Sequence, residues 1–248
     1  MGYNRGFRAD LWQFCKYQIM SLKKGQYFIV ATGTDSGKTF LLTKICKKLR
    51  AKNISCDAIK PIASGFKYDD PQSDSAKILQ SLGEEFSIKN VENITPWRFN
   101  AALAPSIAAV IENSEINFSE LQNFCGERIL WAQNGRVSGS AANVKKPVEY
   151  FLIEGAGGVM TPISSDKTFL DLIVATKIPV LLLGQNYLGA MSHTLCAVEA
   201  LRAKSVAIDK IIINDHPKSE IKISDTIAEI TRFSCIETVA IDDFLSKF

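Results

Sequence analysis

Short apolar runs that alternate with amphipathic patterns constrain the fold of this chain most. Five runs are β-branched or aromatic and end at turn residues, which is typical of buried strands: residues 27–31, 58–59, 150–153, 179–183 and 210–213. Between the first two runs, the apolar residues follow the spacing of an amphipathic helix: Leu41, Leu42, Ile45, Cys46 and Leu49. Further helices are predicted over residues 74–82, 105–112, 119–133, 168–176, 192–203 and 221–231. Strands that alternate with helices predict a parallel sheet.

The alternation begins near Gln26, continues through the chain and shows no internal repeat. We therefore predict one α/β domain over residues 25–248, with a single doubly wound, mostly parallel sheet flanked by helices and joined by right-handed crossovers. Residues 1–24 are predicted to be an N-terminal extension whose order the sequence leaves open, and Met20 is an alternative start. Residues 133–146 are rich in Gly, Ser, Asn and Ala, which predicts a flexible surface loop.

Composition excludes several classes of function. The formal net charge is only +3 in 248 residues, so we expect no nucleic-acid partner. No apolar run is long enough to span a membrane, and the N-terminal residues lack the pattern of a secretory signal. The 6 cysteines lie far apart without a Cys-x-x-Cys pair, and only 2 histidines are present, which argues against a zinc site. Reduced thiols and a cytoplasmic location are expected.

A phosphate-binding loop follows the first predicted strand, with the sequence Ala31-Thr32-Gly33-Thr34-Asp35-Ser36-Gly37-Lys38-Thr39. Such a loop needs backbone N–H groups, a lysine for the terminal phosphates and a hydroxyl for Mg²⁺ at a helix N-terminus. The usual pattern has glycine where this chain has Thr32, and the glycine stands at Gly33 instead. Because the run leads from a strand into a helix, it predicts a P-loop nucleoside triphosphate hydrolase fold rather than an incidental glycine-rich turn.

Two further segments carry groups suited to this chemistry. The predicted strand 150–153 leads into Glu154-Gly155-Ala156-Gly157-Gly158, where the carboxylate can bind Mg²⁺ and the small residues let the backbone approach phosphate. Lys60 ends another predicted strand and Ser64 follows four residues later, a pair suited to an anionic substrate. Downstream, Asp74 is either a helix N-cap or a second Mg²⁺ ligand.

Together these segments resemble the dethiobiotin synthetase family, over roughly residues 26 to 216. That family's loop, Gly-Thr-x-Thr-x-x-Gly-Lys-Thr, aligns without a gap to residues 31–39. Its Lys-Pro-x-x-[ST]-Gly segment aligns to Lys60-Pro61-Ile62-Ala63-Ser64-Gly65, its Ser-Asp to Ser73-Asp74, and its Glu-Gly-Ala-Gly-Gly to residues 154–158. Leu188-Gly189 and Asn214-Asp215 match two later landmarks.

The resemblance implies a reaction in which 7,8-diaminononanoate, CO₂ and ATP give dethiobiotin, ADP and phosphate. By the family's assignments, Lys60 stabilises a carbamate that Ser64 orients, and Lys38 reaches the γ-phosphate. Mg²⁺ is held by Thr39, Asp74 and Glu154. The remaining nucleotide contacts implied are Asp35, Ser36, Gly37, Gly155, Ala156, Gly157, Asp215 and Asn214, the last of which reads the adenine edge.

The resemblance also implies a homodimer with shared sites. The substrate is expected to contact Thr34, and its carboxylate to bind at a helix N-terminus from the neighbouring subunit, formed by Gly189, Ala190, Met191 and Ser192. A plain helix cap at Ser192 is the alternative.

Several positions depart from the family pattern, and other classes share the phosphate loop. Ala31 replaces a glycine, Gly33 and Asp35 differ from the usual residues, and Ser192 stands where asparagine is frequent. A partitioning-type ATPase carries a lysine early in the loop, where this chain has Gly33. A cobyric-acid-type synthetase lacks the segment from Lys60 to Ser64, and a nucleotide-dependent binding module would show no turnover. Base recognition beyond Asn214 stays open.

Overall fold

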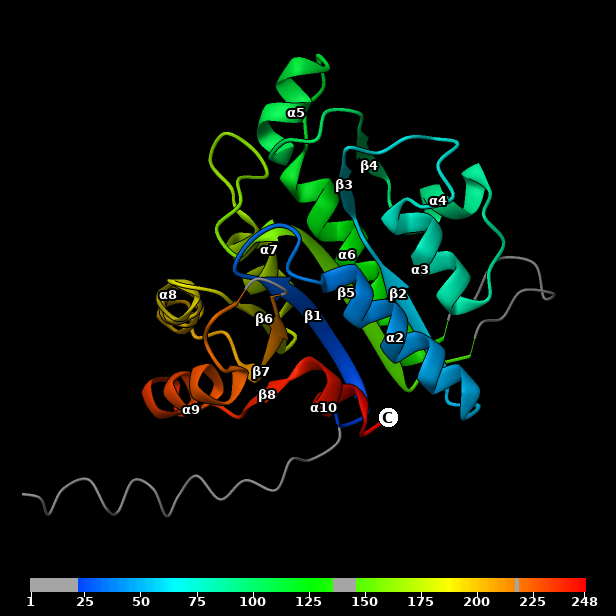
Figure 1. Ribbon diagram of the computed structural model, residues 1–248. Coiled ribbons are helices and arrows are strands. Elements are labelled where there is room, and N and C mark those ends of the chain that lie inside the picture. Colours follow the sequence, from blue (N-terminus) through cyan, green and yellow to red (C-terminus); the bar gives the residue numbers. More distant parts are fainter. Residues whose placement is uncertain (1–21, 136–145, 217–218) are drawn as a thin grey trace, which may run out of the picture.

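The computed structural model describes residues 22–135, 146–216 and 219–248, and Figure 1 shows how their elements are arranged. The strands are β1 (Gly25–Ala31), β2 (Cys56–Ile59), β3 (Ile62–Ser64), β4 (Trp97–Phe99), β5 (Tyr150–Gly158), β6 (Val180–Asn186), β7 (Ile208–Asp215) and β8 (Thr238–Ala240). The helices are α2 (Lys38–Ala51), α3 (Asp74–Leu82), α4 (Ile88–Ile94), α5 (Pro105–Ile111), α6 (Phe118–Asn134), α7 (Phe169–Thr176), α8 (Ala190–Ala203), α9 (Ile223–Ser234) and α10 (Ile241–Leu245).

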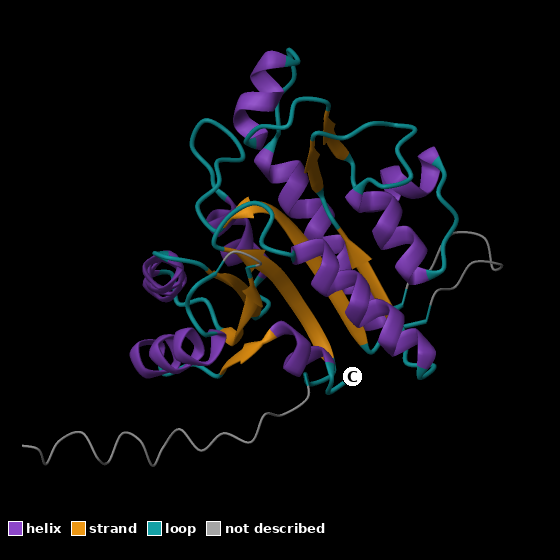
Figure 2. Ribbon diagram, viewed as in Figure 1, coloured by secondary structure: helices purple, strands orange, loops and turns teal. Residues whose placement is uncertain are grey.

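A six-stranded sheet with the order β2-β5-β1-β6-β7-β8 forms the centre of the fold, and every pairing in it is parallel. Helices cover both of its faces (Figure 2). Helix α2 packs with α3 and α10, whereas α6 packs with α7, and α8 packs with α9. The predicted α/β architecture of the P-loop nucleoside triphosphate hydrolase type is confirmed.

The five predicted strands are present as β1, β2, β5, β6 and β7. The core strand β1 is continuously buried from Tyr27 to Ala31, as expected for a strand covered by helices on both faces. The sequence missed β3, β4 and β8, with three residues each, and α10, with five, because they are too short to show a period. It also missed α4, in which only three of seven residues are apolar.

Several predicted boundaries differ from the structure: β6 extends to Asn186 rather than to residue 183, and β7 spans Ile208–Asp215 rather than 210–213. The strand predicted at 150–153 was expected to end at Glu154, but β5 continues through the following glycines to Gly158. The predicted loop at 133–146 begins too early, because α6 extends to Asn134, and residues 136–145 lie outside the described residues.

The described residues begin just ahead of β1. Leu22 is buried, and the Tyr150 hydroxyl donates a hydrogen bond to its carbonyl oxygen at 2.9 Å. Residues 1–21 lie outside the described part of the chain, so the division at residue 24 stays a prediction. Every cysteine within the described ranges is a free thiol. No helix in those ranges has the length and apolar character needed to cross a membrane.

Candidate active site

The phosphate loop, residues 32–37, joins the carboxyl end of β1 to the N-terminus of α2. Its last residue, Gly37, has a φ of 96°, a left-handed conformation that side chains disfavour. A Cβ atom there would also lie 2.7 Å from the Asn214 side-chain nitrogen, which itself donates to the Ser36 carbonyl at 3.2 Å. The glycine is therefore required both by conformation and by the close approach of β7.

The loop is closed on itself by two hydrogen bonds to one carbonyl. The Ser36 hydroxyl donates to the Gly33 oxygen at 3.0 Å, and the Lys38 ammonium donates to the same oxygen at 2.8 Å. Burial lowers the pKa of Lys38 to about 8, although Glu154 opposes this shift. The lysine expected to reach the γ-phosphate thus rests on the loop, at the positive end of α2.

Strand β5 brings its glycines against the start of the phosphate loop. Between the pairs Ile29–Glu154 and Ala31–Gly158, β1 has one residue and β5 has three, so the register shifts there. A Cβ atom on Gly158 would lie 2.8 Å from the carbonyl oxygen of Thr32. Only a glycine allows the loop backbone to lie this close to β5.

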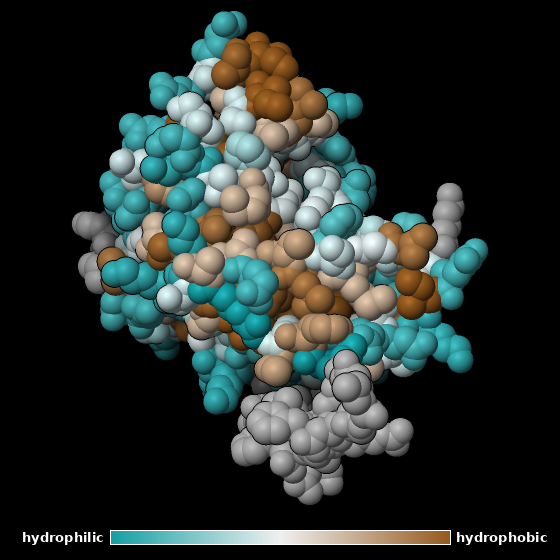
Figure 3. All heavy atoms as spheres, turned by 90° about the vertical axis from the view of Figure 1, so that its left-hand side faces the viewer, coloured by the Kyte–Doolittle hydropathy of each residue, from teal (hydrophilic) through white to brown (hydrophobic). Residues whose placement is uncertain are grey.

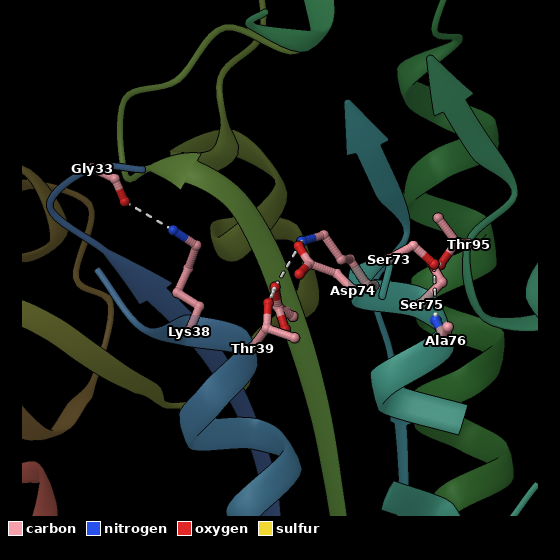
Figure 4. A network of polar contacts seen from close by, with 10 residues as sticks. Gly33, Lys38, Thr39, Ser73, Asp74, Ser75, Ala76 and Thr95 are labelled. Carbon is pink, nitrogen blue, oxygen red and sulfur yellow. Dashed lines mark hydrogen bonds and ion pairs between the residues drawn. The ribbon is translucent and has the colours of Figure 1, made fainter. Parts of the chain in front are cut away.

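Four side chains predicted as site residues meet in one polar cluster (Figure 4). The Lys60 ammonium donates to Glu154 Oε1 at 2.8 Å and forms a second ion pair with Asp74. The Thr39 hydroxyl donates to the same Glu154 oxygen at 2.7 Å. Lys60 comes from the end of β2, Asp74 from α3, Glu154 from β5 and Thr39 from α2, so only the folded chain assembles them.

Two members of the cluster are buried, Asp74 and Thr39 are half-buried, and the charges support one another. Lys60 is 6% exposed and Glu154 is 1% exposed. Burial alone would lower the pKa of Lys60, but the carboxylates of Glu154 and Asp74 outweigh burial and raise it. Burial likewise would raise the pKa of Asp74, but Lys60 outweighs it and the pKa is lowered. The lysine is therefore an ammonium and Asp74 a carboxylate at neutral pH.

Local structure fixes the orientation of the cluster and settles one open alternative. The N-cap of α3 is Ser73, whose hydroxyl accepts from the Ala76 N–H at 3.2 Å. The interpretation of Asp74 as the cap was wrong, because its carboxylate is turned to Lys60 instead. The backbone N–H of Lys60 donates to the Ile94 oxygen at 3.0 Å, so α4, which the sequence missed, holds this lysine in place.

A cavity of about 860 Å³ opens over the cluster and the phosphate loop. Of the predicted site residues, it is lined by Thr34, Asp35, Ser36, Gly37, Lys38, Thr39, Lys60, Ser64, Asp74, Glu154, Ala156 and Gly157. The Ser64 hydroxyl oxygen is buried and has no hydrogen-bond partner. The opposite wall, formed by Ala102, Leu103, Ala104, Pro105, Thr161 and Pro162, was missed, since no motif marks these residues and only the fold brings them here.

Other predicted residues lie outside this cavity. Gly155 faces the core, where a Cβ atom would lie 3.2 Å from the Phe28 ring. Asn214 and Asp215 end β7 beside the phosphate loop. Gly189, with a φ of 93°, is the N-cap of α8, and no side chain caps that helix. The alternative of Ser192 as a cap was therefore wrong, and Ala190, Met191 and Ser192 form the first turn.

Two residues at the end of β6 support the phosphate loop and the end of β7 and were also missed. Gln185 donates to the Asp35 carbonyl oxygen at 3.2 Å. The buried Asn186 amide donates to Asp215 at 2.8 Å and to the Ile221 oxygen at 2.7 Å, and it accepts from Thr226 at 2.7 Å. A polar residue inside an apolar strand pattern is the signal that could have found Asn186.

The donor set of the cluster fits Mg²⁺. Glu154 Oε2 is buried and has no hydrogen-bond partner, which leaves a carboxylate oxygen free for a cation. Together with Asp74 and the Thr39 hydroxyl it offers only oxygen ligands, and Mg²⁺ is commonly bound by one or two carboxylates plus substrate phosphates. Within the described ranges, no group of three or more His, Cys, Asp or Glu residues could hold a metal alone. The residues therefore suit a cation that arrives with a nucleotide.

Comparison with known proteins gives a family match over most of the chain. The model of an AAA domain family matches residues 25–244. The ATP-dependent dethiobiotin synthetase BioD of Phenylobacterium zucineum is 37% identical over 208 residues, which cover 84% of this chain and 83% of that protein. The protein of the same name from Caulobacter vibrioides is 40% identical over 189 residues, which cover 76% of this chain and 78% of that protein.

Among solved structures, the MinD cell division protein of Aquifex aeolicus superposes with a TM-score of 0.46 at 11% identity, covering 90% of this chain and 86% of that one.

Proposed function

The chain belongs to the ATP-dependent dethiobiotin synthetase family, and we propose that it uses ATP and Mg²⁺ to join 7,8-diaminononanoate and CO₂ into dethiobiotin. It is an ATP-dependent ligase of biotin synthesis, and residues 25–248 form its catalytic domain in this proposal. The observation that carries the specific chemistry is the polar cluster of Lys60, Asp74, Glu154 and Thr39 beside the phosphate loop.

The proposed reaction has three steps. One substrate amine adds to CO₂ and loses a proton, giving a carbamate. A carbamate oxygen then attacks the γ-phosphorus of ATP, and ADP leaves. The second amine attacks the carbamoyl carbon of the mixed anhydride and loses a proton, phosphate leaves with the bond electrons, and the cyclic urea closes. Each step concentrates negative charge on the reacting groups. The enzyme must therefore supply positioned cations that stabilise this charge.

The lysines divide this work in our proposal. Lys60 pairs with the carbamate, because it is a buried ammonium that lines the same cavity as the phosphate loop. Ser64 orients the carbamate with its buried hydroxyl, which has no other partner. Lys38 leaves the Gly33 carbonyl and follows the γ-phosphate during transfer. These are charge-assisted hydrogen bonds in a site of low dielectric constant, where such bonds are strongest.

Thr39, Asp74 and Glu154 would hold the metal in this proposal. When bound, Mg²⁺ offsets charge on the β- and γ-phosphates. Glu154 is fixed for this task by its place on the central strand β5 and by the Thr39 hydroxyl. The adenine would lie on the β7 side of the loop, near Asn214 and Asp215.

We also propose a homodimer in which α8 of one subunit binds the substrate carboxylate of its partner. The uncapped N-terminus of α8 offers free N–H groups, which attract an anion, yet it does not line the cavity of its own chain. Leu188, just before it, is 89% exposed. Hydrophobic side chains also gather on α5 in Figure 3, where Ile107, Val110 and Ile111 are exposed. Exposed apolar surface of this kind supports association.

Turnover by a Lys60→Ala variant tests the proposed function. Dethiobiotin formation, followed by mass spectrometry with diaminononanoate, bicarbonate and Mg·ATP, is expected to fall by ~100-fold or more, since one preorganised charge is lost. ATP binding should be retained. Lys210→Ala is the matched control, because Lys210 is also buried and paired with a carboxylate, Glu237, outside the site. Steady ring closure by Lys60→Ala, or none by the parent enzyme, would reject the assignment.

A cytoplasmic location is part of the proposal, supported by ATP use and by the free thiols of the described residues.

A further inference from the structure

The Lys60 ammonium occupies the position where the metal's carboxylate ligands converge. It contacts Glu154 Oε1 at 2.8 Å and is paired with Asp74, the same two carboxylates to which the proposed function assigns Mg²⁺. The Thr39 hydroxyl, the third assigned ligand, donates to that same Glu154 oxygen. Each assigned ligand therefore has a partner within the protein, although Glu154 Oε2 is buried and has none.

Charge balance explains this arrangement. A buried carboxylate without a partner is costly, and the lysine supplies the positive charge that Glu154 and Asp74 need. Lys60 and a divalent cation compete for Glu154 Oε1 and for Asp74, because two like charges at such short distances repel each other. A metal that binds these two oxygens therefore displaces the lysine from them.

We infer that Lys60 is a resident counterion that keeps the metal site closed until nucleotide arrives, and that metal entry with the nucleotide releases Lys60 toward the substrate. The nucleotide phosphates favour the replacement of Lys60 by the metal. Their negative charge offsets part of the charge of the metal, so that the metal and the Lys60 ammonium can both stay in the cavity. The released ammonium remains in the same cavity, which Ser64 also lines. The inference rests on the proposed function, since it takes from there the metal ligands and the role of Lys60.

If Lys60 holds the carboxylates until nucleotide arrives, metal binding should be weak in the absence of nucleotide. Mn²⁺ is the probe, because its free and bound forms are distinguished by electron paramagnetic resonance. The parent enzyme should bind Mn²⁺ weakly on its own. Lys60→Met keeps roughly the length of the side chain but removes the competing ammonium. This variant should bind Mn²⁺ at least ~10-fold more tightly, which corresponds to about 1.4 kcal/mol.

Lys210→Met is the matched control. It removes a buried lysine of β7 from its partner Glu237, which lies just before β8 and away from the site, and should leave Mn²⁺ binding unchanged. Equal Mn²⁺ affinity in the parent enzyme and Lys60→Met would overturn the inference. A gain of equal size in Lys210→Met would overturn it as well, because the effect would then come from net charge.

A second measurement needs no variant that might misfold. In a crystal structure of the parent enzyme with Mn²⁺ and a non-hydrolysable ATP analogue, the Lys60 Nζ atom should no longer lie within hydrogen-bond distance of Asp74 or Glu154. A structure with the metal bound there and Lys60 still paired to both carboxylates would overturn the exchange while leaving the proposed function intact. Mn²⁺ and analogue bound without any contact to Thr39, Asp74 or Glu154 would instead reject the metal assignment of the proposed function.

Discussion

Gly158→Ala tests whether the contact between β5 and the phosphate loop shapes the nucleotide site. The added Cβ atom would lie 2.8 Å from the Thr32 carbonyl oxygen, 3.1 Å from its carbonyl carbon and 3.3 Å from the Ala31 oxygen. Ordinary contacts of this kind are about 3.5 Å or longer, so the loop must move by roughly 0.7 Å. All three atoms are backbone atoms, which cannot turn away as a side chain does. Overpacking of this kind costs about 1–3 kcal/mol.

The assay has two parts. Urea unfolding should show a loss of about 1–3 kcal/mol in the free energy of unfolding. The same displacement should lower kcat/KM for ATP by roughly 10- to 100-fold, because small misplacements at a reacting centre are expensive.

Gly126→Ala is the control for Gly158→Ala, since Gly126 lies inside α6 with nothing within 4 Å of an added Cβ atom. Alanine should stabilise that helix by about 0.5–1 kcal/mol without changing kcat/KM. Wild-type stability and kcat/KM in Gly158→Ala would refute the reasoning, because the backbone would then absorb the methyl group without cost.

Three further predictions concern other parts of the site. The pKa of Lys38 is about 8, and only its ammonium form attracts phosphate, so the affinity of the enzyme for ATP should fall as pH rises through that value. Lys38→Arg stays charged, and titrations of ATP binding at several pH values should show no such dependence for this variant. Asn186→Leu removes the partner of the buried Thr226 hydroxyl and a donor to the Ile221 carbonyl and should cost about 1–3 kcal/mol in urea unfolding; a loss under 0.5 kcal/mol would contradict the network. Leu188→Asp should convert the proposed dimer to monomer in light scattering, and an unchanged mass would argue against that interface.

The phosphate loop, the central strands and the identity of the charged groups could all be predicted from sequence. These features are local: a strand, a glycine-containing turn and an amphipathic helix occupy consecutive residues, and a buried parallel strand shows as an apolar run. Motifs at Lys60 and Glu154 were likewise found, because each stands at the end of a predicted strand. Their family resemblance could be recognised before any distance was known.

The relations among these groups were decided by tertiary structure. The sequence does not show whether Asp74 caps α3 or faces Lys60. In the structure Ser73 is the N-cap of α3, and the carboxylate of Asp74 pairs with Lys60. The apolar wall of the cavity and the support from Asn186 come from segments far apart in sequence, whose contacts no local pattern encodes. The sequence thus determined which charges this protein has, and the fold determined that Lys60 is paired with the carboxylates of Asp74 and Glu154, because a buried charge must find its partner in space rather than along the chain.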